Sequence, residues 1–190
     1  MITKLKPLTI ADWDAMPYGD GNRYEIIEGE LFVSCSPGLT HDGVLINLIL
    51  RIGNFLEANP IGTVAAGTGV ILSNFSGVIP DLVVFLNEQV DTIVKNDRLH
   101  GPPALVVEIL SPGSANIRRD RVIKLQLYAK HGVPEYWIID PRNMMLERYV
   151  AQGSSLNLLE TLRYEDSLST ATLPGFSCQM SEIFKRTLKI

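Results

Sequence analysis

Two apolar stretches of this chain each contain one acidic residue. The first is Ile79-Pro80-Asp81-Leu82-Val83-Val84-Phe85, and the second is Ala104-Leu105-Val106-Val107-Glu108-Ile109-Leu110. Apolar, β-branched runs of this length predict buried strands. A buried carboxylate is strongly unfavourable unless it has a partner. We therefore expect Asp81 and Glu108 to lie on adjacent strands, to face one cleft and to share a partner.

A cation is the simplest shared partner for two carboxylates. Carboxylate oxygens are ligands that Mg²⁺ prefers, and Mn²⁺ binds the same kind of donor. Such an ion polarises a phosphoryl oxygen and lowers the pKa of an attacking water. The two stretches therefore favour a metal-dependent hydrolase of phosphodiester bonds, with Asp81 and Glu108 as the metal ligands.

Length, composition and charge narrow the class of protein. The chain has 190 residues without a linker or repeat, which predicts one domain over residues 1–190. Apolar residues never reach the roughly 18 consecutive positions of a membrane span, so no membrane partner is expected. Cys35 and Cys178 favour reduced thiols and a cytoplasmic location, with a disulfide between them as the alternative. The net charge of −4 argues against a generally basic nucleic-acid-binding protein, but not against a local cationic surface.

Hydrophobic periodicity predicts an α/β fold. We expect an N-terminal hairpin around Glu28-Gly29, an amphipathic helix over 41–59, and a second helix over 114–131 with Ser114 as its N-cap. Further strands are expected at 63–72, 135–140, 146–150 and 156–162, which makes the C-terminal part rich in β-structure. Helices and strands in this order predict a mixed β-sheet flanked by helices.

Phosphodiester cleavage also requires a cation near the scissile group, and lysine suits this role. The position two residues after Glu108 holds Leu110, so the lysine has to come from elsewhere. Lys124 is the next candidate, because Arg121, Lys124, Leu125 and Tyr128 fall on one face of the second helix. From that face Lys124 either reaches inward toward the sheet or lies along the surface as a solvated lysine. Its position in the sequence leaves both possibilities open.

Several ordered motifs resemble the Uma2 family of the PD-(D/E)XK nuclease superfamily. They are Pro80-Asp81, Glu108-Ile109-Leu110-Ser111-Pro112, Asp120-Arg121-Val122-Ile123-Lys124 to Tyr128, and Gly132-Val133-Pro134-Glu135-Tyr136-Trp137-Ile138-Ile139-Asp140-Pro141. The hairpin sequence Tyr24-Glu25-Ile26-Ile27-Glu28-Gly29-Glu30-Leu31 and His41 at the first helix match as well, so the similarity covers nearly the whole chain. Pro-Asp alone is a common dipeptide, whereas the ordered set is specific.

The resemblance implies a restriction-endonuclease-like core with the element order αβββαβ, in a family that is abundant in cyanobacteria. It implies that Asp81 and Glu108 bind Mg²⁺ or Mn²⁺ and that the substrate is DNA. Leu110 departs from the superfamily motif, whose last position is a lysine. The resemblance assigns that lysine to Lys124, on the helix that follows the strand.

Glu25 and His41 are further candidate catalytic residues. Glu25 either adds a third carboxylate to the site or faces solvent on the hairpin. His41 either contacts a substrate phosphate or has a capping or loop role at the start of the first helix. Glu25 and His41 are therefore included among the predicted catalytic residues.

Two functions remain open at this point. The first is a Mg²⁺-dependent DNA endonuclease, and the second is a catalytically inactive nucleic-acid-binding or regulatory protein on the same scaffold. The presence of all three charged residues, Asp81, Glu108 and Lys124, favours the first, because a decayed site would not need them. The acidic net charge and the displaced lysine favour the second, and fold alone does not separate the two. An endonuclease that cuts both strands needs two active sites, so we expect a C₂ homodimer with Leu156, Leu158 and Leu159 at the contact.

Overall fold

The computed structural model describes residues 6–17 and 19–185 of the chain. Within these residues, the strands form two six-stranded sheets and one two-stranded sheet. The central sheet has the order β12-β11-β10-β9-β6-β3. Its strands are β3 (Gly62–Ala66), β6 (Leu82–Leu86), β9 (Leu105–Ile109), β10 (Glu135–Asp140), β11 (Met145–Gln152) and β12 (Ser155–Arg163). Because β9 and β10 are parallel and the other neighbours are antiparallel, the sheet is mixed, as predicted.

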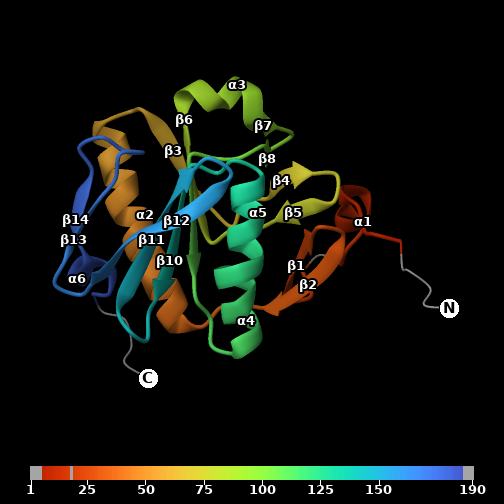
Figure 1. The fold of residues 1–190 in the computed structure, drawn as a ribbon, viewed down its shortest axis with the longest axis horizontal. Coiled ribbons are helices and arrows are strands. Elements are labelled where there is room, and N and C mark those ends of the chain that lie inside the picture. Colours follow the sequence, from red (N-terminus) through yellow and green to blue (C-terminus); the bar gives the residue numbers. More distant parts are fainter. Residues whose placement is uncertain (1–5, 18, 186–190) are drawn as a thin grey trace.

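Two helical segments cover opposite faces of the central sheet (Figure 1). The first is α2 (Leu39–Ala58). The second connects β9 to β10 and consists of α4 (Ser114–Arg118), a π-helical segment η2 (Arg119–Lys124) and α5 (Leu125–Lys130). The order α2, β3, β6, β9, α4–α5, β10 confirms the predicted αβββαβ core.

The second sheet contains the N-terminal hairpin and has the order β2-β1-β5-β4-β8-β7. Its strands are β1 (Asn22–Ile27), β2 (Glu30–Cys35), β4 (Val70–Ser73), β5 (Ser76–Val78), β7 (Val94–Lys95) and β8 (Arg98–His100). The hairpin turns at Glu28 and Gly29, which have φ values of 53° and 83°. Two successive positive φ values are typical of the type I′ turn that joins antiparallel strands tightly.

The remaining elements are short. They are α1 (Ile10–Asp14), η1 (Asn87–Gln89), α3 (Val90–Ile93), β13 (Ser167–Ser169), β14 (Ser177–Gln179) and α6 (Met180–Ile183). In Figure 1, α1 and the hairpin lie at one end of the molecule, and β13, β14 and α6 lie at the other. No helix in the described part of the chain is long and apolar enough to cross a membrane.

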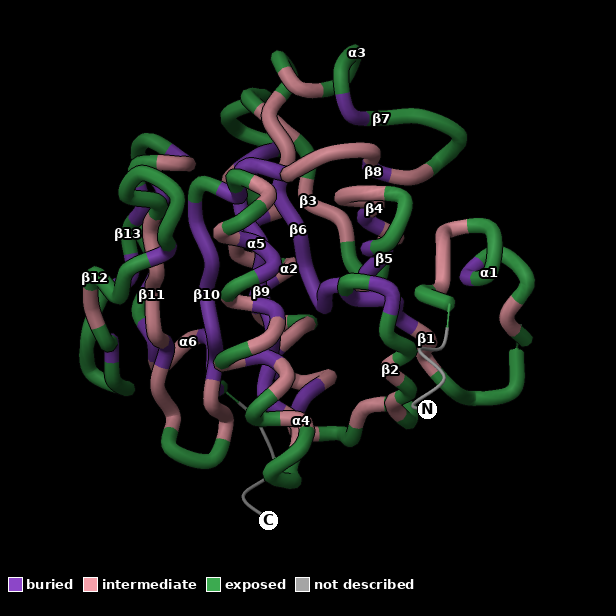
Figure 2. The backbone as a smooth tube through the Cα atoms, turned by 45° about the vertical axis from the view of Figure 1, so that its right-hand side comes forward, coloured by how far each residue is buried: buried purple, intermediate pink, exposed green. Residues whose placement is uncertain are grey.

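Alternation along the central strands divides the core into two clusters. On one face, Leu82, Val84 and Val107 pack with α2 and the C-terminal segment. On the other face, Val83 and Val106 pack with α5 and the second sheet. Figure 2 shows β6, β9 and β10 as largely buried strands between these layers. The face that carries Val83 and Val106 is the one that concerns the site, because Asp81 lies two positions from Val83 and Glu108 lies two positions from Val106.

Three local predictions were wrong. The expected strand over 63–72 is divided between β3 and β4, which belong to different sheets, because the chain turns at Gly67 with a φ of 62°. The second long helix is capped by Gly113, and Ser114 is its first residue. Asp81 immediately precedes β6, so it does not lie within the strand. Because Asp81 precedes β6, it lies outside the hydrogen-bonded pairing of β6 with β9, although it remains beside β9.

Candidate active site

Asp81 and Glu108 lie on the same face of the central sheet. Leu82 is opposite Val107 in the antiparallel pair of β6 and β9, so one further step of the register places Asp81 opposite Glu108. Opposite residues of an antiparallel pair have their side chains on the same face. The backbone N–H of Ile109 donates to Asp81 Oδ2 at 2.8 Å, which holds the carboxylate against β9. The register therefore brings together two carboxylates from distant parts of the sequence.

Two side chains from other elements contact Asp81. Arg23 on β1 donates from NH1 to Oδ1 at 2.8 Å, and His41 Nε2 on α2 lies 3.0 Å from Oδ2. Burial opposes ionisation of Asp81, but the hydrogen bond and charge of His41 and the charge of Arg23 outweigh it, and the pKa of Asp81 lies well below its usual range. Asp81 is therefore an anion that three donors hold in place. His41 contacts Asp81 and does not cap α2, whose N-cap is Gly38.

Lys124 lies inside the protein, between two carboxylates. Its side chain is 1% exposed, and Nζ lies 2.8 Å from Oε1 of Glu108 and 2.8 Å from Oε1 of Glu25. Burial lowers the pKa of a lysine, but here the two carboxylates more than compensate and raise the pKa of Lys124. Lys124 is therefore an internal cation, and the surface alternative is excluded. Glu25 is buried as well, so it does not face solvent on the hairpin.

Glu108 lies at the centre of the cluster. Its Oε1 accepts hydrogen bonds from Lys124 Nζ and from the Tyr128 hydroxyl, both at 2.8 Å. Burial raises the pKa of Glu108; the Lys124 charge opposes this effect, and the charge of Asp81 adds to it. Within residues 6–17 and 19–185, Oε2 of Glu108 accepts no hydrogen bond. The raised pKa means that Glu108 favours a bound proton or a nearby cation. Among the described residues, its Oε2 has no hydrogen-bond donor and is free to bind one.

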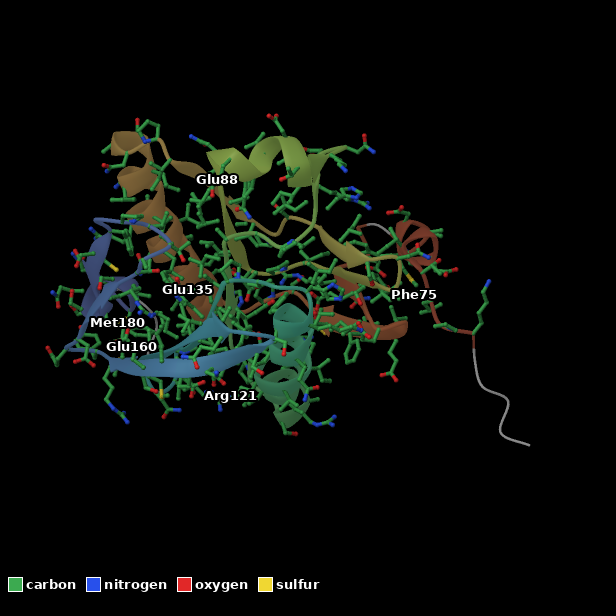
Figure 3. All side chains as sticks on the ribbon, turned by 45° about the horizontal axis from the view of Figure 1, so that its top comes forward. Phe75, Glu88, Arg121, Glu135, Glu160 and Met180 are labelled. Atoms are coloured by element: carbon green, nitrogen blue, oxygen red, sulfur yellow. The ribbon has the colours of Figure 1, made fainter. Side chains whose placement is uncertain are left out.

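The π-helical segment η2 determines which residues of the connecting helix point inward. Asp120, Lys124 and Tyr128 are buried, whereas Arg121 is partly exposed and pairs with Glu147 on β11. Arg121 is labelled in Figure 3 beside this helix, on the side of the β11 and β12 strands. Of the residues predicted to share one face, Lys124 and Tyr128 point inward, whereas Arg121 does not. π-Helical turns change the phase of a helix and occur often at functional sites.

Asp120 adds a fourth buried carboxylate to this region. It accepts a hydrogen bond from Arg119 Nε at 3.1 Å, and its backbone oxygen accepts one from the Tyr136 hydroxyl at 3.0 Å. Burial raises the pKa of Asp120, while Lys124 and Arg119 oppose the shift. The cluster therefore joins Glu25, Asp81, Glu108 and Asp120 to three cationic side chains, those of Arg23, Arg119 and Lys124.

A buried carboxylate elsewhere in the protein provides a contrast. Glu135 on β10 (Figure 3) accepts hydrogen bonds from Trp137 Nε1 at 2.7 Å and from the hydroxyls of Thr170 and Thr172. Both of its oxygens are occupied by side chains of the C-terminal half, and it fixes the C-terminal segment to the sheet. Burial alone therefore does not distinguish the site; the gathering of carboxylates around one lysine does.

The donor chemistry of Asp81 and Glu108 fits a hard divalent cation. Mg²⁺ is commonly bound through one or two carboxylates, with waters completing its coordination. Among the described residues, no group of three or more His, Cys, Asp or Glu side chains is arranged to hold a metal ion. Two opposed carboxylates alone would leave the remaining coordination positions of a Mg²⁺ or Mn²⁺ ion to waters. Binding at Asp81 would require Arg23 or His41 to withdraw, because protein donors contact both of its oxygens.

Four polar residues of the cluster were absent from the predicted site: Arg23, Arg119, Asp120 and Tyr128. Arg23 lies two residues before Glu25 on β1, so strand alternation places both on one face. Tyr128 follows Lys124 by four residues on the helix; the sequence placed the two on one face but gave Tyr128 no role in the site. Asp120 stands among arginines and gave no signal that it would be buried.

Comparison with known proteins places this arrangement in a family. The model of the Uma2 family, described as "Putative restriction endonuclease", matches residues 10–181. The crystal structure of a "putative nuclease belonging to DUF820" from Anabaena variabilis ATCC 29413 has a TM-score of 0.75 to this chain at 17% sequence identity, covering 96% of this chain and 100% of that one. This structural likeness shows the fold, and no curated protein is significantly similar to the chain. Because the family match spans nearly the whole sequence, including every residue of the cluster, the chain belongs to the Uma2 family.

Proposed function

We propose that this protein is a metal-dependent endonuclease that hydrolyses DNA phosphodiester bonds. The observation that carries the proposal is the fully buried Lys124, held 2.8 Å from Glu108 and from Glu25, beside the opposed carboxylate of Asp81. A buried ion-pair cluster of this kind contributes little net stability compared with apolar packing, so stability alone does not account for it. The family description and the nuclease named in the structural comparison support the choice of a nucleic-acid substrate.

Asp81 and Glu108 would hold a Mg²⁺ or Mn²⁺ ion. When bound, such an ion polarises a phosphoryl oxygen and lowers the pKa of a coordinated water. Lys124 Nζ has three N–H donors, of which two point to Glu108 and Glu25. Because Lys124 is buried, the third would reach a phosphate oxygen only after the site opens to admit the substrate; a positive charge there would stabilise the negative charge that develops during hydrolysis.

The neighbouring residues would act by positioning these groups. Tyr128 donates to Glu108 Oε1 and so fixes the orientation of that carboxylate. Glu25 holds Lys124, and its Oε1 is fixed in turn by the backbone N–H of Ile79 at 2.8 Å. His41 and Arg23 keep Asp81 ionised. Arg23 also lies partly exposed at the border of the site, where it can meet a phosphate group.

A catalytically inactive scaffold that binds or regulates nucleic acid is the alternative. It would not require the two metal-binding carboxylates and the lysine to be kept together in the protein interior. The arrangement of Asp81, Glu108 and Lys124 therefore favours the active enzyme. DNA binding without cleavage in the presence of Mg²⁺ or Mn²⁺ would instead identify the inactive scaffold.

Cleavage of both DNA strands would need two active sites, so a C₂ homodimer is part of the proposal. Leu156 is buried in the core and cannot form the contact, which corrects part of the prediction. Leu158 and Leu159 are each 51% exposed on β12, the outermost strand of the central sheet. Pairing of β12 with β12 of a second copy would cover both leucines and the unpaired strand edge.

The test is cleavage of supercoiled plasmid DNA by purified protein. We expect nicking and linearisation with Mg²⁺, and none when EDTA is present. Asp81→Asn and Glu108→Gln should lower the rate at least about 100-fold, because each removes a charged metal ligand. Glu57→Gln on α2, an exposed carboxylate outside the cluster, is the control and should retain the rate. Equal cleavage by wild type and Asp81→Asn would refute the proposed site.

A further inference from the structure

A pocket of about 640 Å³ lies beside the carboxylate cluster. It is bordered by α1, the start of β1, the β3–β4 turn and β8, at the end of the molecule that carries the hairpin (Figure 1). Trp13, Asn22, Arg23, Gly67, Gly69 and Arg98 are among the residues that line it. Two arginines in one pocket of an acidic protein indicate a site for an anionic ligand.

Arg23 connects the pocket to the site. Its NH1 donates to Asp81 Oδ1 at 2.8 Å and to the carbonyl oxygen of Ile79 at 3.3 Å. In the described part of the chain, Nε and NH2 of Arg23 donate to no protein group, and the side chain is 28% exposed. A guanidinium has five donors and binds phosphate through two of them at once. Arg23 can therefore contact a phosphate in the pocket while it lies beside Asp81.

Arg98 forms the opposite wall of the pocket and is held in a fixed position. Its guanidinium lies over the Trp13 ring, 5.2 Å from the centroid, and pairs with Asp14. Trp13 is fixed by a 2.7 Å hydrogen bond from Nε1 to the carbonyl oxygen of Tyr24. A Cβ at Gly69 would be in ordinary van der Waals contact with Trp13 at 3.4 Å and with Arg98 at 3.5 Å, so Gly69 lies directly against this stacked pair. Arg98 is 40% exposed, and its outer face is accessible to a ligand.

The β3–β4 turn leaves the pocket open between these walls. Gly67 has a φ of 62°, and a Cβ at this position would meet nothing within 4 Å. Backbone without a side chain permits close approach of a ligand. The pocket thus combines a stacked arginine, a second arginine that reaches the site carboxylate, and an open stretch of backbone.

We infer that this pocket binds a nucleotide of the DNA strand next to the scissile phosphate, with Arg23 and Arg98 contacting its phosphate groups. The inference rests on the proposed nuclease function, since it names where the substrate of that site extends. A nucleotide matches the pocket in chemistry, because phosphate suits the arginines, and a base suits the outer face of the Arg98 guanidinium and apolar lining residues such as Met16 and Pro37.

Binding of a fluorescein-labelled 20-base-pair DNA duplex in EDTA tests the inference without catalysis. The dissociation constant is measured by fluorescence anisotropy over a range of salt concentrations. Arg98→Gln should weaken binding about tenfold at low salt, as expected for loss of a charged hydrogen bond. The slope of log K against log [salt] should fall by about one, because one phosphate contact is lost.

Two variants separate a phosphate contact from a structural effect. Arg51→Gln is the matched control, because Arg51 is 38% exposed and pairs with Glu182 on the side of α2 that meets α6. It should leave affinity and salt slope unchanged. Asp14→Asn breaks the same ion pair as Arg98→Gln but removes a negative charge from the pocket, so it should tighten DNA binding. Weaker binding by both Asp14→Asn and Arg98→Gln would assign the effect to the ion pair and overturn the inference.

The remaining outcomes are equally decisive. An unchanged salt slope in Arg98→Gln would remove the pocket from the DNA-binding surface while leaving the nuclease proposal intact if plasmid is still cleaved. DNA binding that depends on Arg98 in a protein that cleaves nothing would uphold the pocket and refute the nuclease. Equal displacement of labelled DNA by poly-glutamate and by unlabelled DNA, at matched charge, would identify a general anion site and overturn the assignment to a nucleotide.

Discussion

Lys124→Met should lower the free energy of unfolding by about 3–5 kcal/mol, the usual result of removing one partner from a buried charge pair. The structure supports a value in this range, because Lys124 is 1% exposed and its Nζ contacts Glu108 and Glu25 at 2.8 Å. Methionine retains an apolar stem, so the loss reflects the missing charge and not a cavity. For a chain of this length, it corresponds to a decrease in Tm of roughly 6–20 °C. The complete burial of Lys124 thus extends its expected importance from catalysis to folding.

The assay is urea unfolding followed by tryptophan fluorescence, in EDTA. Lys130→Met is the matched control, because Lys130 also pairs with a glutamate, Glu28, but is 60% exposed. It should lose no more than about 1 kcal/mol. Adding Glu108→Gln to Lys124→Met should restore part of the stability, because it removes one of the carboxylates left without a cation.

The dependence on pH provides a second check of the same prediction. The raised pKa of Lys124 keeps it protonated through neutral pH, so its contribution in the wild type is fully present between about pH 5 and 8. In Lys124→Met, the buried carboxyl groups become neutral by binding protons as the pH falls. The deficit should therefore be smaller at pH 5 than at pH 8. A loss equal to that of Lys130→Met, or one independent of pH, would refute the internal position of Lys124.

Three further predictions concern Glu108, the thiols and the assembly. The pKa of Glu108 is raised, so its ionisation destabilises the fold as the pH rises above the usual carboxyl range. In EDTA, the Tm of wild type should therefore fall between pH 5 and pH 8, and the Tm of Glu108→Gln should fall less. Parallel Tm profiles of the two proteins would contradict this prediction. Burial raises the pKa of Cys178 to about 11, whereas Cys35 is exposed. Ellman's reagent at pH 8 should therefore titrate one thiol in the native protein and two in guanidinium. Rapid reaction of both thiols in the native protein would count against the buried position of Cys178. Leu158→Lys should convert a dimer to a monomer in light scattering, whereas Ile46→Lys, at an exposed apolar position of α2, should not; a monomeric wild type would remove the dimer proposal.

Most of the fold could be predicted from the sequence, because the core strands are apolar runs and the helices have periodic apolar residues. The predicted strand 135–140 has the same bounds as β10, and the turn at Glu28-Gly29 closes the hairpin as expected. The strand over 63–72 was wrong because both halves are suitable for β-structure, and only the positive φ at Gly67 separates them. Which sheet each half joins depends on contacts with distant segments.

The candidate site could be predicted only in part from the sequence. Asp81 and Glu108 were visible as carboxylates in apolar runs, and the antiparallel register places them on one face. The orientation of Lys124 could not be decided, because the π-helical segment shifts the phase that a regular helix would have. Arg23 meets Asp81 across 58 positions of sequence, and its only local signal is alternation with Glu25. Contacts of this range depend on the packing of two sheets, which no local pattern encodes.

The central claim is that Asp81 and Glu108 hold a divalent cation beside Lys124. Anomalous diffraction from crystals soaked in Mn²⁺, at the concentration that supports plasmid cleavage, tests it most directly. We predict an anomalous peak between the two carboxylates, with the Arg23 or His41 side chain moved away from Asp81. The peak should be absent in Asp81→Asn crystals treated in the same way. A Mn²⁺ ion bound elsewhere, with Asp81 still held by both Arg23 and His41, would contradict the account.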